Sequence, residues 1–274
     1  MTQPSPAAGI DGDVSPVITV QHASVRQRLH DVCVSGMAGE LIHLIGPNGA
    51  GKSTLLAYMA GVLSGQGTLS LLGQPMAGWS ARDMARVRAY LPQQHAVQVL
   101  MPVFQYLQLH QPPHADSKQV DGVVHELAER LLLREKLARP LNQLSGGEWQ
   151  RVRLAAVFLQ IWPTLNPAAR LLLLDEPAAS LDIGQRVALD SLLAEVCRYG
   201  IAAVVSGHDL NHTLHHADRV WLMEHGQLIA HGPTVQVMQP ERLSQLFGVA
   251  FSRYTLGDRY WMLARQEIPA DDES

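Results

Sequence analysis

Residues 41–60 read LIHLIGPNGAGKSTLLAYMA, and this stretch decides the fold. Residues 41–45 form a short, mostly apolar run that is typical of a buried strand. Residues 54–60 read as a helix that stops at Gly61. Between them, residues 46–53 fit the spacing G-x-x-x-x-G-K-[ST]. A strand, a glycine-rich loop and a helix in this order predict a phosphate-binding loop rather than a chance glycine-rich turn.

The residue types of this loop suit the phosphates of a nucleotide. Glycines let the backbone curl so that its N–H groups point at the phosphates, while Lys52 reaches the β- and γ-phosphates. The hydroxyl of Ser53 is expected to bind Mg²⁺. The residues expected to contact the nucleotide here are Gly46, Pro47, Asn48, Gly49, Ala50, Gly51, Lys52, Ser53 and Thr54.

The composition is that of one globular unit. The 274 residues are 47% hydrophobic and 17% charged, which leaves ample apolar material for a core. The net charge of −4 does not favour broad nucleic-acid binding. No run approaches the 18 or so apolar residues of a membrane-spanning helix, so we expect a soluble, cytoplasmic protein.

The ends of the chain and its two cysteines give further expectations. Residues 1–16 lack the regions of a signal peptide and are expected to be a disordered tail. Residues 266–274 are expected to be an acidic tail, of which the last four residues are solvated and disordered. Cys33 and Cys197 lie far apart in apolar surroundings. We interpret them as small core residues rather than a disulfide, which fits a reducing compartment.

Strand and helix signals alternate after the loop and predict an α/β fold. Residues 17–20 and 68–72 read as strands beside the phosphate-binding loop, and residues 89–93 as a strand that ends in the polar Gln93. From about 95 to 160 the pattern turns helical, which predicts a helical subdomain inside a single domain of residues 17–265.

Residues 144–148 read LSGGE and stand where a helix of residues 148–160 is expected to begin. Ser145 followed by Glu148 is a capping box, and this alone explains the run in structural terms. A helix start also offers backbone N–H groups to an anion. With the phosphate-binding loop, this makes two anion-binding signals, which suggest a nucleotide held between two copies of the chain.

An acidic pair follows a strand of four leucines, residues 171–174. Such a strand is buried on both faces, as parallel sheets require. Asp175 and Glu176 therefore lie at its carboxyl end, where open α/β sheets bind ligands. We expect Asp175 to hold Mg²⁺, directly or through water, and Glu176 to polarise the attacking water as general base. Two exposed acids that cap the next helix are the alternative.

Another apolar strand, residues 201–206, brings His208 to the same end of the sheet. Its imidazole is placed to contact the γ-phosphate or the attacking water. Together with His212, His215 and His216 it also has the helical spacing of metal ligands. We do not predict a metal site there, because no cysteine or carboxylate completes the set and His208 already has a role.

The last part of the chain predicts a hairpin with a turn at His225 and Gly226. Helical segments are expected around Val235 and Leu243, followed by a strand-like stretch at residues 251–263.

In order and spacing, these motifs resemble the nucleotide-binding subunits of ABC transporters over residues 17–235. The loop at 46–53 matches that family's Walker A motif, and residues 144–148 match its signature. The remaining matches are Gln93 to the Q-loop, residues 171–176 to Walker B, Ser180 and Asp182 to the D-loop, and His208 to the switch histidine. The resemblance implies an α/β P-loop NTPase fold: an ABC-type ATPase domain with a RecA-like core, an antiparallel β subdomain and a helical subdomain.

The resemblance also implies the cofactors ATP and Mg²⁺, and hydrolysis of ATP to ADP and phosphate. The implied catalytic residues are Lys52, Glu176 and His208, and the implied Mg²⁺ ligands are Ser53, Gln93 and Asp175. In this family two subunits pair head to tail. Ser145, Gly146, Gly147 and Glu148 would then face the Walker A motif of the other copy.

Four stretches resemble more narrowly the ATP-binding subunits of bacterial vitamin B12 importers: the N-terminal region and residues 144–156, 161–169 and 208–214. This implies a homodimer with two membrane-spanning permease subunits and a periplasmic cobalamin-binding protein. It also implies a peripheral position on the cytoplasmic face of the inner membrane, through the permease. An iron-siderophore or haem importer has the same architecture. A soluble ABC ATPase of DNA repair or translation usually has a second ATPase unit or a long coiled-coil insertion, and this chain has neither.

One position departs from the family. Its members usually place an aromatic residue near the end of the first strand, against adenine, and residues 21–28 contain none. Arg26 or Arg28 could stack its planar guanidinium on the base instead.

Overall fold

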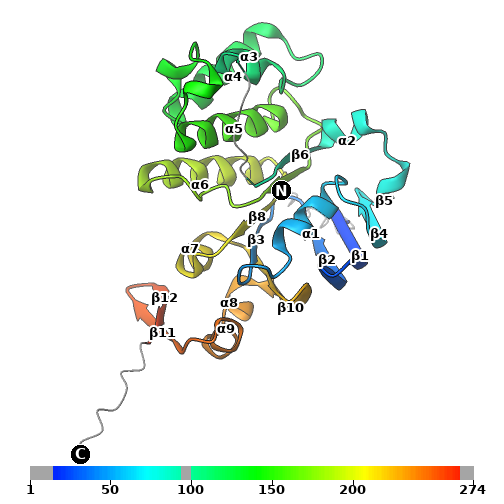
Figure 1. The fold of residues 1–274 in the computed structure, drawn as a ribbon, viewed down its shortest axis with the longest axis vertical. Coiled ribbons are helices and arrows are strands. Elements are labelled where there is room, and N and C mark those ends of the chain that lie inside the picture. Colours follow the sequence, from blue (N-terminus) through cyan, green and yellow to red (C-terminus); the bar gives the residue numbers. More distant parts are fainter. Residues whose placement is uncertain (1–14, 94–99, 266–274) are drawn as a thin grey trace, which may run out of the picture.

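The computed structural model describes residues 15–93 and 100–265 (Figure 1). Most of the expected N-terminal tail and all of the acidic end at 266–274 lie outside these residues. A six-stranded sheet forms the centre, in the order β10-β9-β3-β8-β7-β6. Its strands are β3 (Leu41–Ile45), β6 (Arg88–Leu91), β7 (Leu171–Leu174), β8 (Ala202–Gly207), β9 (Arg219–Glu224) and β10 (Gln227–Pro233). All neighbours are parallel except β9 and β10, which form the expected hairpin.

The leucine strand β7 shows how this sheet is buried. Successive side chains of a strand point to opposite faces. Leu171 and Leu173 accordingly pack with one core cluster, and Leu172 and Leu174 with another. All four are fully buried, and each contributes about 1.5–3 kcal/mol relative to an exposed side chain. The strand therefore has no solvent-facing side, as its four consecutive leucines predict.

One face of the central sheet is covered by helix α1 (Lys52–Met59) and by a four-stranded antiparallel sheet. This second sheet has the order β2-β1-β4-β5. Its strands are β1 (Ile18–Val25), β2 (Leu29–Gly36), β4 (Gln66–Leu71) and β5 (Gln74–Pro75). A 3-10 turn, η1 (Met76–Gly78), and helix α2 (Ala81–Val87) lead from it into β6.

The opposite face carries the other helices of the first 200 residues. They are α3 (Val103–Gln108), α4 (Ser117–Arg130), α5 (Gly146–Ile161) and α6 (Ile183–Arg198), with the 3-10 turns η2 (Arg134–Lys136) and η3 (Leu141–Gln143). The buried apolar side chains of these four α-helices belong to one core cluster with Leu172 and Leu174. Figure 1 shows α3, α4 and α5 grouped on one side of the sheet and α1 on the other. Among the described residues, the helices are all too short or too polar to span a bilayer.

The C-terminal elements form a third cluster beside the end of β3. Helix α7 (Leu210–His216) is followed by α8 (Thr234–Val237), α9 (Pro240–Phe247) and a hairpin of β11 (Phe251–Leu256) and β12 (Arg259–Ala264). Met262 of this hairpin packs with Ile45 and Leu222. Asn211 of α7 fixes the hairpin, since its side chain exchanges two hydrogen bonds with the backbone of Met262, at 2.9 and 2.7 Å. The tail expected to be strand-like is thus two paired strands.

Cys33 corrects an expectation from the sequence. It lies on β2 between the buried Val32 and Val34, and the alternation of a strand turns its side chain outward, so it is exposed rather than part of the core. Cys197 does pack against a core cluster, and burial raises the pKa of its thiol to about 12. Both are free thiols.

Candidate functional site

The site is assembled by the central sheet. Ile45 of β3 pairs with Gly207 of β8, while Leu174 of β7 pairs with Val205 of β8 and with Leu91 of β6. Because these strands are parallel and adjacent, the segments that follow them leave the sheet at the same edge. Those segments begin with Gly46, Pro92, Asp175 and His208. Four motifs far apart in the sequence therefore share one rim.

The phosphate-binding loop is held by backbone and lysine contacts. Gly46 has no room for a side chain, since a Cβ there would lie 2.2 Å from the carbonyl oxygen of Met223. Gly51 caps α1 with a φ of 103°, in the left-handed region that favours glycine. The ammonium of Lys52 donates to the carbonyl oxygens of Gly46 at 2.7 Å and Pro47 at 3.1 Å. Burial lowers its pKa, while Glu176 and Asp175 act in the opposite direction.

The remaining loop residues differ in exposure. Asn48, Gly49 and the expected Mg²⁺ ligand Ser53 are exposed, whereas Ala50 and Thr54 are buried. Asn48, Gly49 and Ser53 therefore face solvent, while their neighbours Ala50 and Thr54 are packed in the protein.

The acidic pair depends on a serine that the sequence reading missed. Asp175 is only 2% exposed, and its Oδ1 accepts a hydrogen bond of 2.7 Å from the hydroxyl of Ser206 on β8. The same hydroxyl accepts a bond of 2.8 Å from the backbone N–H of Glu176. Glu176 has a φ of 48°, a conformation that costs a non-glycine residue about 1–2 kcal/mol. In the sequence, the polar Ser206 at the end of the otherwise apolar run of residues 201–206 is the signal that could have identified this contact.

Glu176 and His208 meet at a cavity of about 160 Å³. Ser206 also lines it, together with Asp190 of α6 and His212 of α7. The structure therefore brings together two of the three residues expected to be catalytic. His208 is exposed and Glu176 is partly buried, so both are reachable from this side of the sheet.

A buried histidine closes the same cavity. His43 of β3 is 4% exposed, and its Nδ1 lies 2.9 Å from the hydroxyl oxygen of Thr213. Burial, helped by the neighbouring His212, lowers the pKa of His43 to about 3, so its ring is neutral. Its Nε2 is buried and has no hydrogen-bond partner in the described part of the chain.

The LSGGE run begins α5 with a complete capping box. The hydroxyl of Ser145 accepts from the N–H of Glu148 at 3.3 Å, and Glu148 Oε2 accepts from the N–H of Ser145 at 2.8 Å. Glu148 Oε1 also lies 2.7 Å from the ammonium of Lys136. These contacts lower the pKa of Glu148 to about 2, and the contact with Lys136 has the largest effect. The side chain of Glu148 is therefore engaged within its own subunit.

Helix α5 also ties the other motifs together. The side chain of Gln150 donates to the carbonyl oxygen of Pro177, just after Glu176, at 2.9 Å. Arg153 donates to Gln150 Oε1 at 3.0 Å and to the carbonyl oxygen of Pro92, next to Gln93. Both side chains are buried. The sequence reading missed this link, although polar residues such as Gln150 and Arg153 on a helix rich in apolar residues were a signal for it.

The remaining predicted site residues are Gln93, Ser180 and Asp182. Gln93 is exposed after the end of β6, and the next six residues are outside the described range. Asp182 is the N-cap of α6 and forms a second capping box with Gln185. Ser180 lies close to the LSGGE run, because a Cβ added to Gly147 would be 3.0 Å from the carbonyl oxygen of Ser180.

The two anion-binding motifs start helices on opposite faces of the central sheet. Leu55 and Leu56 of α1 pack in one core cluster, and Val152 and Leu154 of α5 in the other. The cavity at Glu176 is lined neither by the loop at 46–53 nor by residues 144–148. A single chain thus does not bring both motifs into that cavity.

The expected adenine position lies beside β1. Arg26, Gln27 and His30 line a hollow with residues 63–66, and this hollow has a volume of about 570 Å³. Arg28 is not among the lining residues, although its carbonyl oxygen approaches Gly51. Of the two arginines expected near the base, only Arg26 borders this space.

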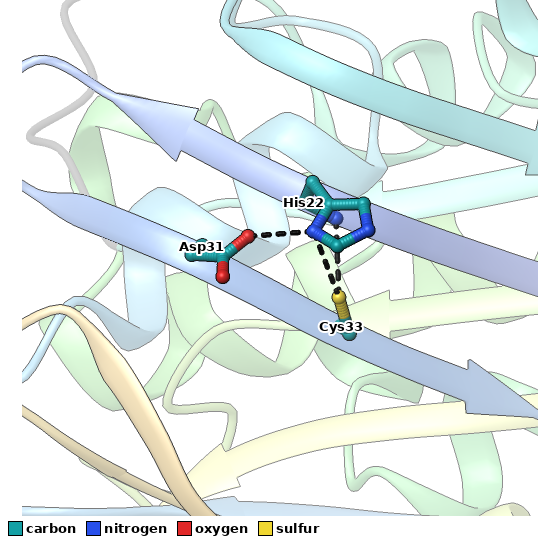
Figure 2. A group of neighbouring side chains, drawn as sticks. All are labelled: His22, Asp31 and Cys33. Carbon is teal, nitrogen blue, oxygen red and sulfur yellow. Dashed lines mark hydrogen bonds and ion pairs between the residues drawn. The ribbon is translucent and has the colours of Figure 1, made fainter.

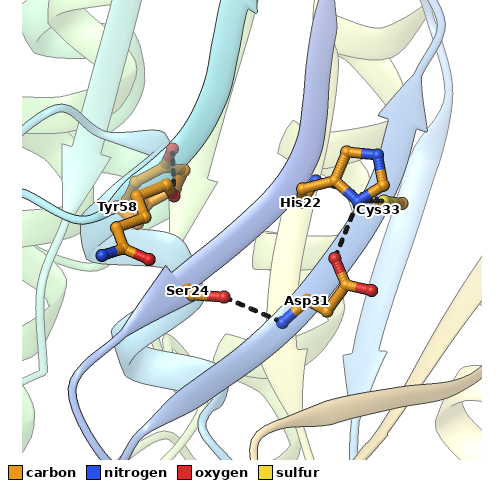
Figure 3. Close-up of polar contacts among 6 residues, drawn as sticks. His22, Ser24, Asp31, Cys33 and Tyr58 are labelled. Atoms are coloured by element: carbon orange, nitrogen blue, oxygen red, sulfur yellow. Dashed lines mark hydrogen bonds and ion pairs between the residues drawn. The ribbon is translucent and has the colours of Figure 1, made fainter.

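Near this hollow, three ligand-type side chains meet on the outer face of β1 and β2 (Figure 2). His22 Nδ1 lies 2.7 Å from Asp31 Oδ1 and 3.8 Å from the sulfur of Cys33. All three residues are exposed. The hydroxyl of Ser24 accepts from the N–H of Asp31 at 3.1 Å, and the hydroxyl of Tyr58, on α1, donates to the carbonyl oxygen of Gln66 at 3.3 Å (Figure 3).

The chain matches the family described as "ABC transporter" over residues 29–179, more than half of its length. The chain belongs to the ABC transporter family. The matched segment contains the phosphate-binding loop, the LSGGE run and the acidic pair. The prediction of an ATP-binding subunit of this family is confirmed.

Relatives of known description are similar in sequence to this chain over nearly its whole length. It is 61% identical, over 90% of its length and 98% of the relative's, to the vitamin B12 import ATP-binding protein BtuD of Pectobacterium atrosepticum. It is 50% identical to the BtuD proteins of Yersinia pseudotuberculosis, over 91% and 98% of the two lengths, and of Escherichia coli, over 88% and 95%.

Solved structures confirm the ABC cassette fold. A structure described as the ATP-binding subunit of an ABC transporter has a TM-score of 0.73 at 23% identity, over 85% of this chain and 94% of that one. The ADP conformation of MJ1267, an ATP-binding cassette of an ABC transporter, has a TM-score of 0.67 at 20% identity, over 85% and 98%. The mixed α/β fold with a parallel core sheet and an antiparallel subdomain is therefore the one expected.

Proposed function

We propose that this chain is the subunit that binds and hydrolyses ATP to drive vitamin B12 import across the inner membrane. The observation that carries the substrate assignment is the identity of 50–61% to vitamin B12 import ATP-binding proteins over about nine-tenths of the chain. An ABC ATPase subunit does not contact the transported molecule. Its whole-length similarity, rather than any pocket, therefore supports the substrate.

In this proposal the rim of the central sheet binds the nucleotide. The backbone of residues 46–54 surrounds the phosphates. The ammonium of Lys52, which donates to the carbonyl oxygens of Gly46 and Pro47 in this structure, would donate to phosphate oxygens instead. Ser53 and Asp175 offer a hydroxyl and a carboxylate, and Gln93 an amide, the oxygen ligands that Mg²⁺ prefers. Ser206 would orient Asp175 for this binding, because its hydroxyl donates a 2.7 Å hydrogen bond to the carboxylate. Bound Mg²⁺ would neutralise charge that develops on the phosphates.

Hydrolysis needs a base and a group that senses the γ-phosphate. Glu176 is proposed to accept the proton of the attacking water, since its carboxylate borders the cavity at the end of β7. His208 lines the same cavity and would contact the γ-phosphate or the water. Their shared cavity supports roles in one reaction.

The active site is proposed to be completed by a second copy. Ser145, Gly146, Gly147 and the backbone of Glu148 would face the partner's phosphate-binding loop, with Ser180 and Asp182 at the same interface. The packing of α1 and α5 in different core clusters, on opposite faces of the central sheet, supports this. ATP then favours the closed dimer because it binds that state better, and hydrolysis removes the preference.

The assembly that we propose contains two permease subunits and a periplasmic cobalamin-binding protein. The ATPase dimer would lie peripherally on the cytoplasmic face and reach the membrane through the permease. Gln93 lies between the central sheet and the helices at 100–161, where movement at the nucleotide could pass to the permease.

Uptake of labelled cobalamin in a strain that lacks the gene for this chain tests the proposal. We expect uptake to be lost, to return with the wild-type chain, and to stay absent with Glu176→Gln. Uptake of an iron siderophore serves as the control and should not change. Normal cobalamin uptake with loss of siderophore uptake would overturn the substrate assignment, and full rescue by Glu176→Gln would overturn the role of the base.

A further inference from the structure

Helices α6 and α7 bring together three side chains that the proposed ATPase mechanism does not use. His212 Nε2 lies 2.9 Å from Asp190 Oδ1, and His216 Nε2 lies 3.9 Å from Asp190 Oδ2. One ligand atom from each of the three lies within 4.8 Å of the others. The sequence alone does not predict a metal site here, because no cysteine or carboxylate completes the histidine set and His208 already has a role. The fold supplies that carboxylate from α6, 22 residues before His212.

We propose that Asp190, His212 and His216 form a binding site for a divalent transition metal ion, Zn²⁺ being the best match. Zinc is held by imidazole nitrogens and carboxylate oxygens at about 2.0–2.2 Å, so ligand atoms around a tetrahedral ion are about 3.3 Å apart. The separations from Asp190 to the two imidazole nitrogens in the structure, 2.9 and 3.9 Å, bracket this value. Small side-chain rotations would close the set around an ion.

The two imidazoles are already oriented. His212 and His216 are one helical turn apart on α7, and their rings stack with centroids 4.5 Å apart. On its other side α7 is held by the two Asn211 bonds to Met262 and by His215, whose Nε2 lies 2.8 Å from the carbonyl oxygen of Tyr260. The helix therefore presents the pair from a fixed position, which lowers the entropy lost on binding.

The cavity beside the cluster provides room for the rest of a metal's coordination. Asp190 and His212 line the space of about 160 Å³, and so does His43, whose buried Nε2 has no partner among the described residues. His43 stacks on His212 with ring centroids 5.5 Å apart. Water bound to the ion would lie beside His43 in this cavity and give its Nε2 the partner that it lacks.

The ligand set selects the class of metal. Two imidazoles and one carboxylate suit zinc, copper or nickel, whereas Mg²⁺ and Ca²⁺ prefer oxygen ligands. Asp209 also lies near the cluster, and Arg186 and Arg259 bring positive charge toward His212 and His216. The net charge is therefore small, and binding must come from the nitrogen ligands. Such a site joins α7 to α6 across the cavity.

The second ligand group, His22 with Asp31 and Cys33, is the natural competitor (Figure 2). Its members are exposed, at 76% for the His22 side chain and 75% for Asp31, against 41% for His216, 30% for His212 and 17% for Asp190. Water competes less at the partly buried cluster. The two groups also differ in chemistry, because only the group at His22 contains a thiol, that of Cys33, and this difference makes them separable by experiment.

The test uses the full chain without nucleotide, treated with a chelator and titrated with Zn²⁺ by calorimetry. We expect one strong site, an upward shift of Tm by several degrees, and an affinity that falls at least about 100-fold in His216→Gln and in Asp190→Asn. His215→Gln is the matched control, since His215 is on the same helix but contacts Tyr260 and Trp261. It should bind Zn²⁺ as the wild type does.

Co²⁺ in place of Zn²⁺ identifies the ligands. We expect a visible spectrum without thiolate-to-cobalt charge transfer, unchanged in Cys33→Ser. Metal-free Tm values show that each variant folds. The proposal is overturned if no strong site exists, if His216→Gln and Asp190→Asn bind as the wild type does, or if Cys33→Ser abolishes binding.

Discussion

At the scale of single residues, Ser206 shows how much of the acidic site depends on one hydroxyl. It donates to the buried carboxylate of Asp175 and accepts from the N–H of Glu176. A buried carboxylate is costly unless it is hydrogen-bonded. The second hydrogen bond, from the N–H of Glu176, anchors the backbone of a residue that has a left-handed φ of 48°. Ser206 is therefore a positioning residue for both acids.

Replacing Ser206 by alanine should separate metal binding from nucleotide binding. Without the hydroxyl, Asp175 loses its orientation, so the Mg²⁺ concentration needed for half-maximal ATPase activity should rise about tenfold or more. The free energy of unfolding should fall by about 1–3 kcal/mol, because Asp175 and the Glu176 N–H lose a buried partner. ATP binding without Mg²⁺ should stay within about twofold of the wild type. An unchanged Mg²⁺ dependence would contradict the positioning role.

At the scale of elements, α5 connects parts that the sequence separates. Through Gln150 and Arg153 it contacts the carbonyl oxygens of Pro177 and Pro92, which flank the acidic pair and Gln93. A movement of α5 would therefore displace the backbone at both Pro177 and Pro92. Burial lowers the pKa of Arg153, but an arginine side chain keeps its charge at physiological pH, so the link is a charged one.

Arg153→Met should weaken this link while keeping the length of the side chain. We expect kcat to fall about tenfold and the affinity for ATP to change less than twofold, because the phosphate-binding loop is untouched. Arg151→Met is the control on the same helix and leaves the contact between Gln150 and Pro177 in place. The split between kcat and KM is the decisive readout. Equal losses in both variants would point to a general effect on folding.

The start of α5 gives a pH dependence with a definite sign. Contact with Lys136 and the capping bonds lower the pKa of Glu148 from 4.5 to about 2, so the folded chain keeps this carboxylate ionised when the unfolded chain has bound a proton. The stabilisation is complete above about pH 4.5 and is lost as the pH falls toward 2. The difference in urea unfolding free energy between wild type and Glu148→Gln should shrink over this range. Lys136→Met should lose most of the same pH dependence, and parallel curves would contradict the assignment.

The elements also show which features a sequence can predict. The strand of residues 171–174 and the hairpin around His225 and Gly226 follow from local patterns, and the structure has both. Cys33 was misjudged because its neighbours are apolar, while its outward direction depends on strand register. Ser206 and Asp190 act through partners 31 and 22 residues away, so only the packing of β8 on β7 and of α6 on α7 reveals their roles.

At the scale of the whole molecule, the placement of the two anion-binding motifs points to a working unit larger than one chain. The phosphate-binding loop leads into α1 on one face of the central sheet, and the LSGGE run starts α5 on the other. A nucleotide bound by both motifs then lies between two copies. In the proposed dimer ATP would be a ligand of the assembly, so we expect activity to depend on protein concentration as well as on ATP.

Ser145→Arg tests this arrangement, because an arginine at the interface should block the approach of a second copy and leave the chain's own loop intact. For the isolated chain, the wild-type ATPase rate per molecule should rise with protein concentration and show a Hill coefficient above one for ATP. Ser145→Arg should lose hydrolysis at least 100-fold while its monomer binds ATP within about twofold of the wild type. In a Glu176→Gln background, ATP should drive dimers on size exclusion, and adding Ser145→Arg should abolish them. Concentration-independent turnover by wild-type monomers would show that one chain is sufficient.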